Sequence, residues 1–273
     1  MKKTLCSITL LSISIIGLIQ FASLSFAEDR KRPVTGKFSV MPEIGTDFTV
    51  GGDFVKSASE SATLTLTGGS TIAANVSSNS QDFDDVYHSP FKVGMDVNYG
   101  LTDYTEVFFG LNYTKAEAKN FDALTVDAAG SFAGIAISPS ETISGKFDDY
   151  REFGFGVGTR HFFNRFGTLT PYVSLEGGLT HNENIELELS AAGGRISDIG
   201  FYEDTWKARL EFGGGFLYDV SDAVSVGVES GIDYDFGMDG DDSVLNNAGA
   251  FERTNDDGDR LSIPLMFSIR VKF

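Results

Sequence analysis

The sequence predicts an all-β protein, an antiparallel up-and-down barrel of eight strands. Apolar and polar residues alternate with a period of two in eight separate stretches, as they do in a strand whose two faces meet different surroundings. The 273 residues include 31 Gly and 24 Phe but only 6 Pro, a composition that suits strands with one crowded face. The connections between the stretches are alternately short and long, so the two ends of the barrel differ.

Each stretch is interpreted as a strand because its apolar residues fall on alternate positions and therefore share one face. In the first four stretches, in chain order, this face contains Val40 and Phe48, Val93 and Val97, Phe109 and Leu111, and Phe155 and Val157. In the last four it contains Val173 and Leu175, Leu210 and Phe212, Val226 and Val228, and Phe267 and Ile269. The opposite faces carry mainly glycine, serine and charged residues.

The connections differ in length in a regular way. The three short ones are residues 102–104, 164–168 and 221–223. The four long ones lie near residues 56–86, 115–148, 182–204 and 237–259, and each exceeds 20 residues. Because the strand number is even, both chain ends belong at the end of the barrel that has the short turns.

The distribution of apolar residues predicts a membrane protein. In a soluble lipocalin-like barrel the apolar face points inward, but here a face of glycine and charge opposes a large apolar one on every strand. Lipid outside and a polar plug inside require this arrangement. Each strand reaches the roughly 9–11 residues that a tilted strand needs to cross a bilayer. We therefore expect a transmembrane barrel with four long extracellular loops.

At this point the chain resembles the small eight-stranded outer-membrane proteins of Gram-negative bacteria, the OmpA-barrel and OmpX type. The resemblance is carried by the alternating loop lengths and by the terminal alternation that ends in Phe273. It implies an outer-membrane location, a monomer, and contact with outer-membrane lipid and lipopolysaccharide. It also implies a C-terminal signal for the β-barrel assembly machinery, which here consists of Leu265, Phe267, Ile269, Val271 and Phe273.

The N-terminus predicts export from the cytoplasm. Met1-Lys2-Lys3 precedes an apolar stretch, and Ser25-Phe26-Ala27 places small residues at a cleavage site. We expect a signal peptide at 1–27, a short periplasmic segment at 28–35 and the barrel domain at 36–273. A membrane-anchoring helix is the alternative, weakened by the serines within the stretch.

Charge and cysteine content exclude several classes of function. The first 27 residues hold two of the 21 basic residues and no acid, which leaves 19 basic against 39 acidic residues. This excess of negative charge excludes a nucleic-acid partner, since phosphate binding needs a basic surface. The single cysteine, Cys6, lies in the leader. Without it the chain has no disulfide and no zinc–thiolate site.

Charged residues on the polar face of the strands predict a lumen charge network. Its members are Glu43, Asp47, Lys92, Asp96, Glu106, Glu152, Arg160, Glu176, Lys207, Arg209, Glu211, Glu229, Asp233 and Arg270. Eight strands leave little more than side-chain room inside a barrel, so we expect these residues to form a plug of ion pairs. The alternative is a narrow porin-like channel for small solutes, in which they would set ion selectivity.

Enzymatic chemistry has few candidate residues. His88, His161 and His181 are the only histidines, and none has a recognisable Ser–acid pattern around it. The glycines at 154, 156 and 158 superficially suggest a nucleotide-binding loop. The full spacing of such a loop and a following helix are absent, so we interpret them as small residues on the inward face of a strand. We expect no catalytic residues, no metal site and no cofactor. A lipid A-modifying barrel enzyme remains an alternative.

Aromatic residues near the strand ends predict two interfacial girdles. On the short-turn side these are Tyr99, Tyr104, Phe163, Tyr172, Tyr218 and Phe273. On the long-loop side they are Tyr87, Tyr113, Tyr202, Trp206 and Tyr234.

The long loops are the expected place of function. Residues 63–67 and 132–143 alternate like strands, which predicts hairpins that continue beyond the membrane. A ten-stranded barrel is the alternative if Ala62–Val76 forms a membrane hairpin. The acidic runs at 239–242 and 256–259 are typical of a solvated loop. The expected function is therefore that of a non-enzymatic outer-membrane surface protein, whose acidic loops contact the envelope or a surface ligand.

Overall fold

The computed structural model describes residues 34–65, 71–132, 135–137, 140–191, 194–241, 251, 253–256 and 258–273. The predicted signal peptide at 1–27, with Cys6, and most of the predicted periplasmic segment at 28–35 lie outside the described residues. In the described part of the chain, no helix is long and apolar enough to cross a bilayer.

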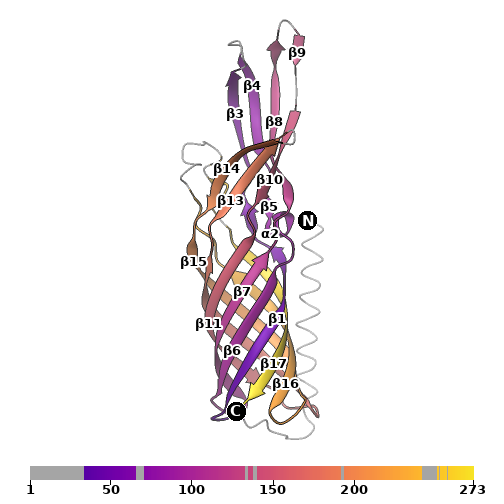
Figure 1. Cartoon of the computed structure of the whole chain (residues 1–273), viewed down its shortest axis with the longest axis vertical. Helices are drawn as coiled ribbons and strands as arrows, with labels where there is room; N and C mark the ends of the chain where they lie inside the picture. The colour runs from indigo at the N-terminus through magenta and orange to yellow at the C-terminus, as the bar shows by residue number, and fades with distance from the viewer. Residues whose placement is uncertain are drawn as a thin grey trace.

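Among the described residues, eight antiparallel strands close into a barrel in the order β1-β17-β16-β15-β12-β11-β7-β6 (Figure 1). Their bounds are β1 Phe38–Gly51, β6 Phe91–Gly100, β7 Thr105–Ala116, β11 Tyr150–Phe162, β12 Leu169–Asn182, β15 Thr205–Asp219, β16 Val224–Asp235 and β17 Arg260–Lys272. If only the barrel strands are counted, each strand pairs with the one that comes before it and the one that comes after it in the chain. The last barrel strand, β17, pairs with the first, β1, and so closes the barrel. The predicted up-and-down barrel is confirmed, and each predicted stretch overlaps one of these strands.

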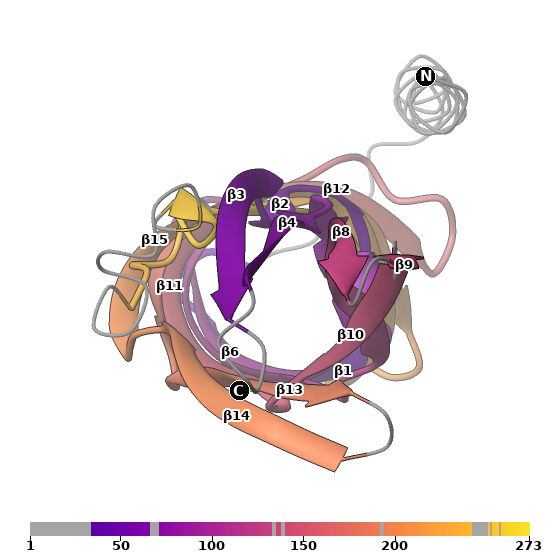
Figure 2. The same ribbon diagram turned by 90° about the horizontal axis from the view of Figure 1, so that it is seen from above.

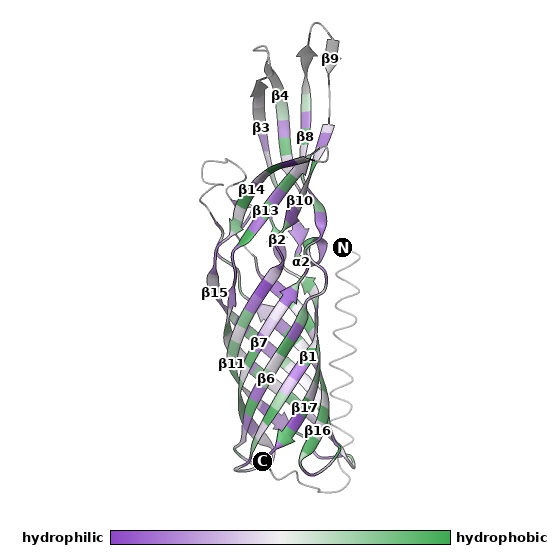
Figure 3. Cartoon of the chain, viewed as in Figure 1, coloured by the Kyte–Doolittle hydropathy of each residue, from purple (hydrophilic) through white to green (hydrophobic). Residues whose placement is uncertain are grey.

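The alternating residues of each barrel strand point in turn to the outer surface and to the lumen. On β11, Phe153, Phe155 and Val157 point outward, and Val157 is 65% exposed, while Gly154 and Gly156 between them and Arg160 beyond them are buried. Large apolar side chains are exposed in the same way on the other barrel strands, and the alternation is visible along the barrel wall in Figure 3. Only lipid can cover so much outward apolar surface, because water penalises it.

Glycine on the inner face makes room for charge. A Cβ atom added at Gly156 would collide with the Glu176 carboxylate, and one added at Gly213 would collide with the Glu229 carboxylate. These two glycines therefore allow large acidic side chains to lie flat against a neighbouring strand inside a narrow barrel.

A second sheet rises beyond one end of the barrel, with strand order β14-β13-β10-β8-β4-β3 and with β9 paired to β8. The strands are β3 Ala58–Thr65, β4 Thr71–Ser78, β8 Asn120–Phe132, β9 Ile135–Ile137, β10 Ser140–Phe147, β13 Ile185–Ala191 and β14 Gly194–Tyr202. A small pair, β2 Asp53–Val55 with β5 Gln81–Asp82, and the short helix α2 Phe83–Val86 lie beneath it. We call all of these elements the crown, and Figure 2 shows the second sheet curving above the barrel mouth.

The crown answers two of the sequence-based expectations. Within the described residues, strands continue beyond the barrel in both regions predicted to form hairpins, as β3 at Thr63–Thr65 and as β9 and β10 near 135–143. The ten-stranded alternative is wrong for the described chain, since the Ala62–Val76 region contributes β3 and β4 to the second sheet and not to the barrel. Its Thr, Ser and Asn side chains suit water rather than lipid.

Two girdles of aromatic residues are only partly present. Tyr99, Tyr218 and Trp206 are exposed on the outer surface, as a girdle requires. Tyr87, Tyr172 and Tyr202 are instead almost fully buried, so their assignment to the girdles is wrong. Tyr172 alternates with outward residues and therefore points inward, while Tyr87 and Tyr202 belong to the crown.

Candidate functional site: the barrel lumen and its closures

Most of the predicted lumen residues are buried together inside the barrel. Eleven of the fourteen are buried, and Glu43, Glu176 and Glu211 are partly buried beside an internal cavity. The structure places thirteen of the fourteen in three groups of ion pairs, which follow one another from the short-turn end of the barrel to the crown end, and Glu43 borders the cavity between the first two groups.

The group nearest the short turns is centred on Glu106. This carboxylate is fully buried and accepts hydrogen bonds from Arg160 at 3.0 Å and from Arg270 at 2.9 and 2.5 Å. Arg160 also donates to Asp96 at 3.0 Å and to Asn98 at 2.8 Å. Because each bond joins a charged donor to an acceptor within a low-dielectric interior, the group is held far more tightly than a surface pair.

Glu229 extends this group across the barrel. Its carboxylate accepts hydrogen bonds from Tyr172 at 2.7 Å and from Ser174, and it lies 3.7 Å from Arg160. The Arg160 guanidinium stacks over the rings of Phe108 and Tyr172, at 4.8 and 5.0 Å from their centroids. Arg160 thus contacts both carboxylates and the faces of two aromatic rings, which suits a delocalised cation.

The middle group is centred on Asp233, which is fully buried. Arg209 donates through Nε to both oxygens of Asp233, at 2.8 and 2.9 Å, and Lys92 donates to it at 3.1 Å. Arg209 also contacts Glu211 and lies 3.5 Å from Glu176. Lys92 lies 3.8 Å from Asp47, whose own oxygens make no hydrogen bond within the described residues.

The group nearest the crown contains two residues that the sequence analysis missed, Arg260 and Asp235. Arg260 donates to Asp235 at 2.9 and 2.5 Å and lies 3.6 Å from Glu152. Lys207 lies 3.0 Å from Glu152 and donates to the Tyr150 hydroxyl. The alternation could have identified both missed residues, because Asp235 follows Asp233 by two positions and Arg260 lies on the inward parity of β17.

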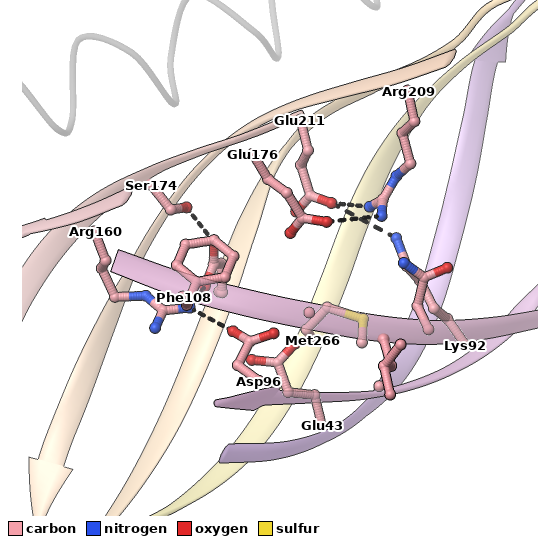
Figure 4. A pocket seen from close by; sticks show the side chains of 15 residues that line it. Glu43, Lys92, Asp96, Phe108, Arg160, Ser174, Glu176, Arg209, Glu211 and Met266 are labelled. Atoms are coloured by element: carbon pink, nitrogen blue, oxygen red, sulfur yellow. Dashed lines mark hydrogen bonds and ion pairs between the residues drawn. The ribbon is translucent and has the colours of Figure 1, made fainter. Parts of the chain in front are cut away.

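A small cavity of about 30 Å³ separates the first and middle groups. Since one water needs roughly 10–15 Å³, it has room for about two. Glu43 and Asp96 border it from the adjoining strands β1 and β6 (Figure 4). Glu176 and Glu211 border it from β12 and β15. No wide passage runs through the described lumen at this level.

An aromatic cluster closes the crown end, and we call it the aromatic cap. Its rings are those of Phe54, Phe83, Tyr87, Phe147, Tyr150, Phe201 and Tyr202. Phe54 is at its centre, with edge-to-face contacts to four of the others at 5.0–5.8 Å between centroids. Arg260 lies against the rings of Phe83 and Tyr150, so the cap rests directly on the uppermost ion pairs.

The hydroxyls of the cap are satisfied internally. Tyr87 donates to the Asp148 carbonyl at 3.0 Å, and Tyr202 donates to the Phe54 carbonyl at 2.6 Å. Burial raises the pKa of the Tyr87 hydroxyl well above its usual range, which keeps it a neutral donor. Sequence reasoning missed the cap because all of its rings except Tyr150 of β11 come from the long connections between the barrel strands.

The short-turn end has an apolar closure too, formed by Val34, Met41, Phe162, Tyr172 and Leu217. Met41, Tyr172 and Leu217 are fully buried. Arg270 lies 5.5 Å from the centroid of the Phe162 ring, so this closure also adjoins a charged group. The described lumen is therefore filled by charge in the middle and by apolar side chains at both ends.

The histidines lie away from the lumen. His161 contacts the Thr105 hydroxyl at 3.1 Å and packs edge-to-face on Phe163. His181 lies 2.5 Å from the exposed Asp204 and against the Trp206 ring on the outer wall. His88 is exposed beside the crown and donates its backbone N–H to Glu117.

The residues of the predicted C-terminal signal occupy alternate positions of β17 and the residue that follows it. Phe267, Ile269 and Phe273 are more than half exposed on the outer wall, and Leu265 and Val271 are partly buried beside them. Phe273 donates its backbone N–H to Phe38, which fixes the chain end against the first strand.

A closed antiparallel barrel with an apolar outer wall and a charged interior is a transmembrane β-barrel, and barrels of this kind belong to outer membranes. The protein is accordingly an outer-membrane β-barrel protein of the small, eight-stranded kind, in a lipid environment.

No protein-family model matches the chain, and no curated protein matches it. Among solved structures, it is similar to Neisserial surface protein A, with 14% identity over 86% of this chain and 97% of that one and a TM-score of 0.42. It is also similar to the attachment invasion locus protein Ail of Yersinia pestis, with 11% identity over 88% and 99% and a TM-score of 0.37. The outer membrane protease OmpT of Escherichia coli aligns at 11% identity over 91% and 100%, with a TM-score of 0.39. These similarities are low, and the fold rests on the strand pairing described above.

Proposed function

We propose that this protein is a non-enzymatic surface protein of the outer membrane, with a plugged lumen and a crown that carries interactions outside the cell. The observation that carries this proposal is the filling of the lumen. Three groups of ion pairs occupy its length, an apolar cluster closes each end, and the cavity between them measures about 30 Å³. A barrel with a filled lumen is suited to hold the crown at the membrane surface, and it is poorly suited to transport solutes.

The positions of the histidines support a role without catalysis. His161 and His181 lie on the outer wall, where their partners are a threonine, an exposed aspartate and aromatic rings. Neither adjoins the cavity in the lumen. A lipid A-modifying enzyme would instead show acyl-chain chemistry that is lost when His161 or His181 is replaced.

Further proposals concern partners and layout. We place the crown outside the cell and residues 28–35 in the periplasm, after cleavage of a signal peptide at 1–27. Lipopolysaccharide would surround the crown end of the barrel. The β-barrel assembly machinery would read the outward residues of β17 that end in Phe273. The crown presents acidic residues such as Asp122, Glu188 and Asp198 for envelope or surface interactions.

Planar-bilayer conductance of the refolded protein tests the proposal, with heat-modifiable gel mobility as the measure of folding. We expect heat modifiability without steady conductance, because ion pairs and apolar side chains fill the described lumen around a cavity of about 30 Å³. Stable unit conductance would overturn the plug and favour a narrow channel for small solutes. Glu43 and Asp96, which border the cavity, would then be the first residues to replace.

A further inference from the structure

The crown contains an apolar pocket of about 240 Å³, separate from the lumen. Leu187 and Leu189 of β13, Ile199 and Phe201 of β14, and Val76 of β4 contribute to its wall. The lining residues of β13 are two positions apart, and so are those of β14. Residues at alternate positions of a strand share one face, so these side chains lie on the inner face of the curved second sheet.

A β-bulge on β8 enlarges the apolar wall. Ile143 of β10 pairs with Leu124 and Ser144 pairs with Asp122, so Ala123 is an extra residue with no partner across the ladder. As a result the neighbours Ala123 and Leu124, which a regular strand would place on opposite faces, both line the pocket.

Few polar side chains line the described part of the pocket. None of its lining residues is charged, and two of them, Ser78 and Thr254, carry hydroxyls. The Ser78 hydroxyl accepts a hydrogen bond from the Ala58 N–H at 3.0 Å, and the Thr254 hydroxyl donates to the Phe251 carbonyl at 2.9 Å. A ligand that needs hydrogen bonds would lose them on entering, whereas a hydrocarbon group would lose only contact with water.

The strands around the pocket carry an excess of negative charge. β8 and β13 each have two acidic residues, and β10 and β14 each have one acidic and one basic residue, which makes six acids against two bases. A molecule with an anionic head group would be repelled as it approached this part of the crown.

We propose that the crown pocket binds a small uncharged molecule with a hydrocarbon body. The volume of about 240 Å³ exceeds the roughly 150 Å³ of an engineered apolar cavity that holds benzene, so a short aliphatic chain fits. The apolar wall supplies the affinity, and the surrounding acids supply selection against anions. This adds a ligand site to the crown and does not depend on the partner that the crown meets.

A titration with 1-octanol and octanoate tests this proposal, because the two probes share a chain and differ in charge. The full protein is refolded into nanodiscs of deuterated lipid with labelled Ile, Leu and Val methyl groups. We expect saturable shifts at Leu187, Leu189 and Val76 with 1-octanol. Octanoate should bind about tenfold more weakly, which corresponds to about 1.4 kcal/mol. Shifts that rise linearly and fall mainly on the lipid-facing barrel wall would mean partitioning into lipid, and would overturn the proposal.

Matched variants on β14 locate the site. Ile199→Phe adds volume at the pocket, whereas Ile196→Phe adds the same volume at a residue outside the pocket that is 56% exposed. We expect the first variant to weaken 1-octanol binding about tenfold and the second to leave it unchanged. Leu124→Phe fills the pocket from β8 and serves if Ile199→Phe does not fold. Unchanged binding in a folded pocket-filling variant would overturn the proposal.

Discussion

At the scale of single residues, Arg160 shows how the lumen is held together. It binds Glu106, Asp96 and Asn98 through hydrogen bonds of 2.8–3.0 Å, and it is buried against two aromatic rings. Arg160→Met removes the cation and leaves its acidic partners buried without it. We expect the free energy of unfolding to fall by about 3–5 kcal/mol, measured by urea titration with heat-modifiable mobility as the signal.

Arg151→Met is the matched control, since Arg151 lies on the same strand in an exposed pair with Glu183 at 3.3 Å. Its loss should stay within about 1 kcal/mol because water screens the pair. Equal losses in the two variants would show that the buried network contributes no more than a surface ion pair.

The sequence predicts the members of this network better than their partners. Alternation places Arg160, Glu106 and Arg270 on one face of three strands, which identifies them as inward residues. It does not show that Glu106 lies between the two arginines, because that depends on how far each strand is shifted along its neighbour. Arg260 and Asp235 are different, since each lies at the end of a strand on its inward parity and the alternation alone could have identified them.

At the scale of elements, the inward glycines set how closely two strands and their acids pack. Gly213→Ala on β15 would drive a methyl group into the Glu229 carboxylate and the Ser174 hydroxyl. We expect a loss of about 1–3 kcal/mol in the same urea titration, since an extra methyl group overpacks the lumen. Gly177→Ala on β12 faces outward with open space around it, and it should unfold like the parent. A Gly213→Ala protein as stable as the parent would show that the Glu229 and Ser174 side chains can move aside without a loss of stability.

The last strand allows a separate test of assembly. Phe273 is 75% exposed, so Phe273→Ala removes little packing from the folded barrel. We expect less folded barrel in outer membranes, measured by heat-modifiable mobility of membrane fractions, with unchanged urea stability of what has assembled. Phe38→Ala, at the same end of the barrel and 55% exposed, should assemble normally. An equal defect in both variants would assign the effect to lost lipid contact and not to a signal.

At the scale of the whole molecule, barrel and crown form separate sheets joined by short links. β2 pairs with β5 at Val55 and Gln81, so the β3–β4 hairpin leaves and re-enters at one point. Replacing residues 56–80 by Asn-Gly should leave a barrel with unchanged heat modifiability, because no barrel strand pairs with β3 or β4. Loss of the folded form in outer membranes would show that the hairpin is needed to close the barrel.

The two sheets also differ in how far the sequence predicts them. Barrel strands are constrained by lipid on one face and by charge on the other, which gives a pattern that can be read without a structure. The crown strands have water on one face and both polar and apolar side chains on the other. The alternation at Thr63–Thr65 therefore predicts a strand, but it does not predict which strand pairs with it. The aromatic cap depends on Phe54, Phe147 and Phe201 meeting from three separate connections, and no local pattern encodes that meeting.

The plug has a consequence for the order in which the protein is made. Arg270 reaches Glu106 across 164 positions of the chain, and Lys92 reaches Asp233 across 141. The early strands therefore carry charges whose counter-ions are synthesised last. A half-finished sheet inserted in a bilayer would expose those charges at an open edge with only part of their partners present. We therefore expect the last strands to be needed before the barrel is stable in the membrane, because they complete the charge network.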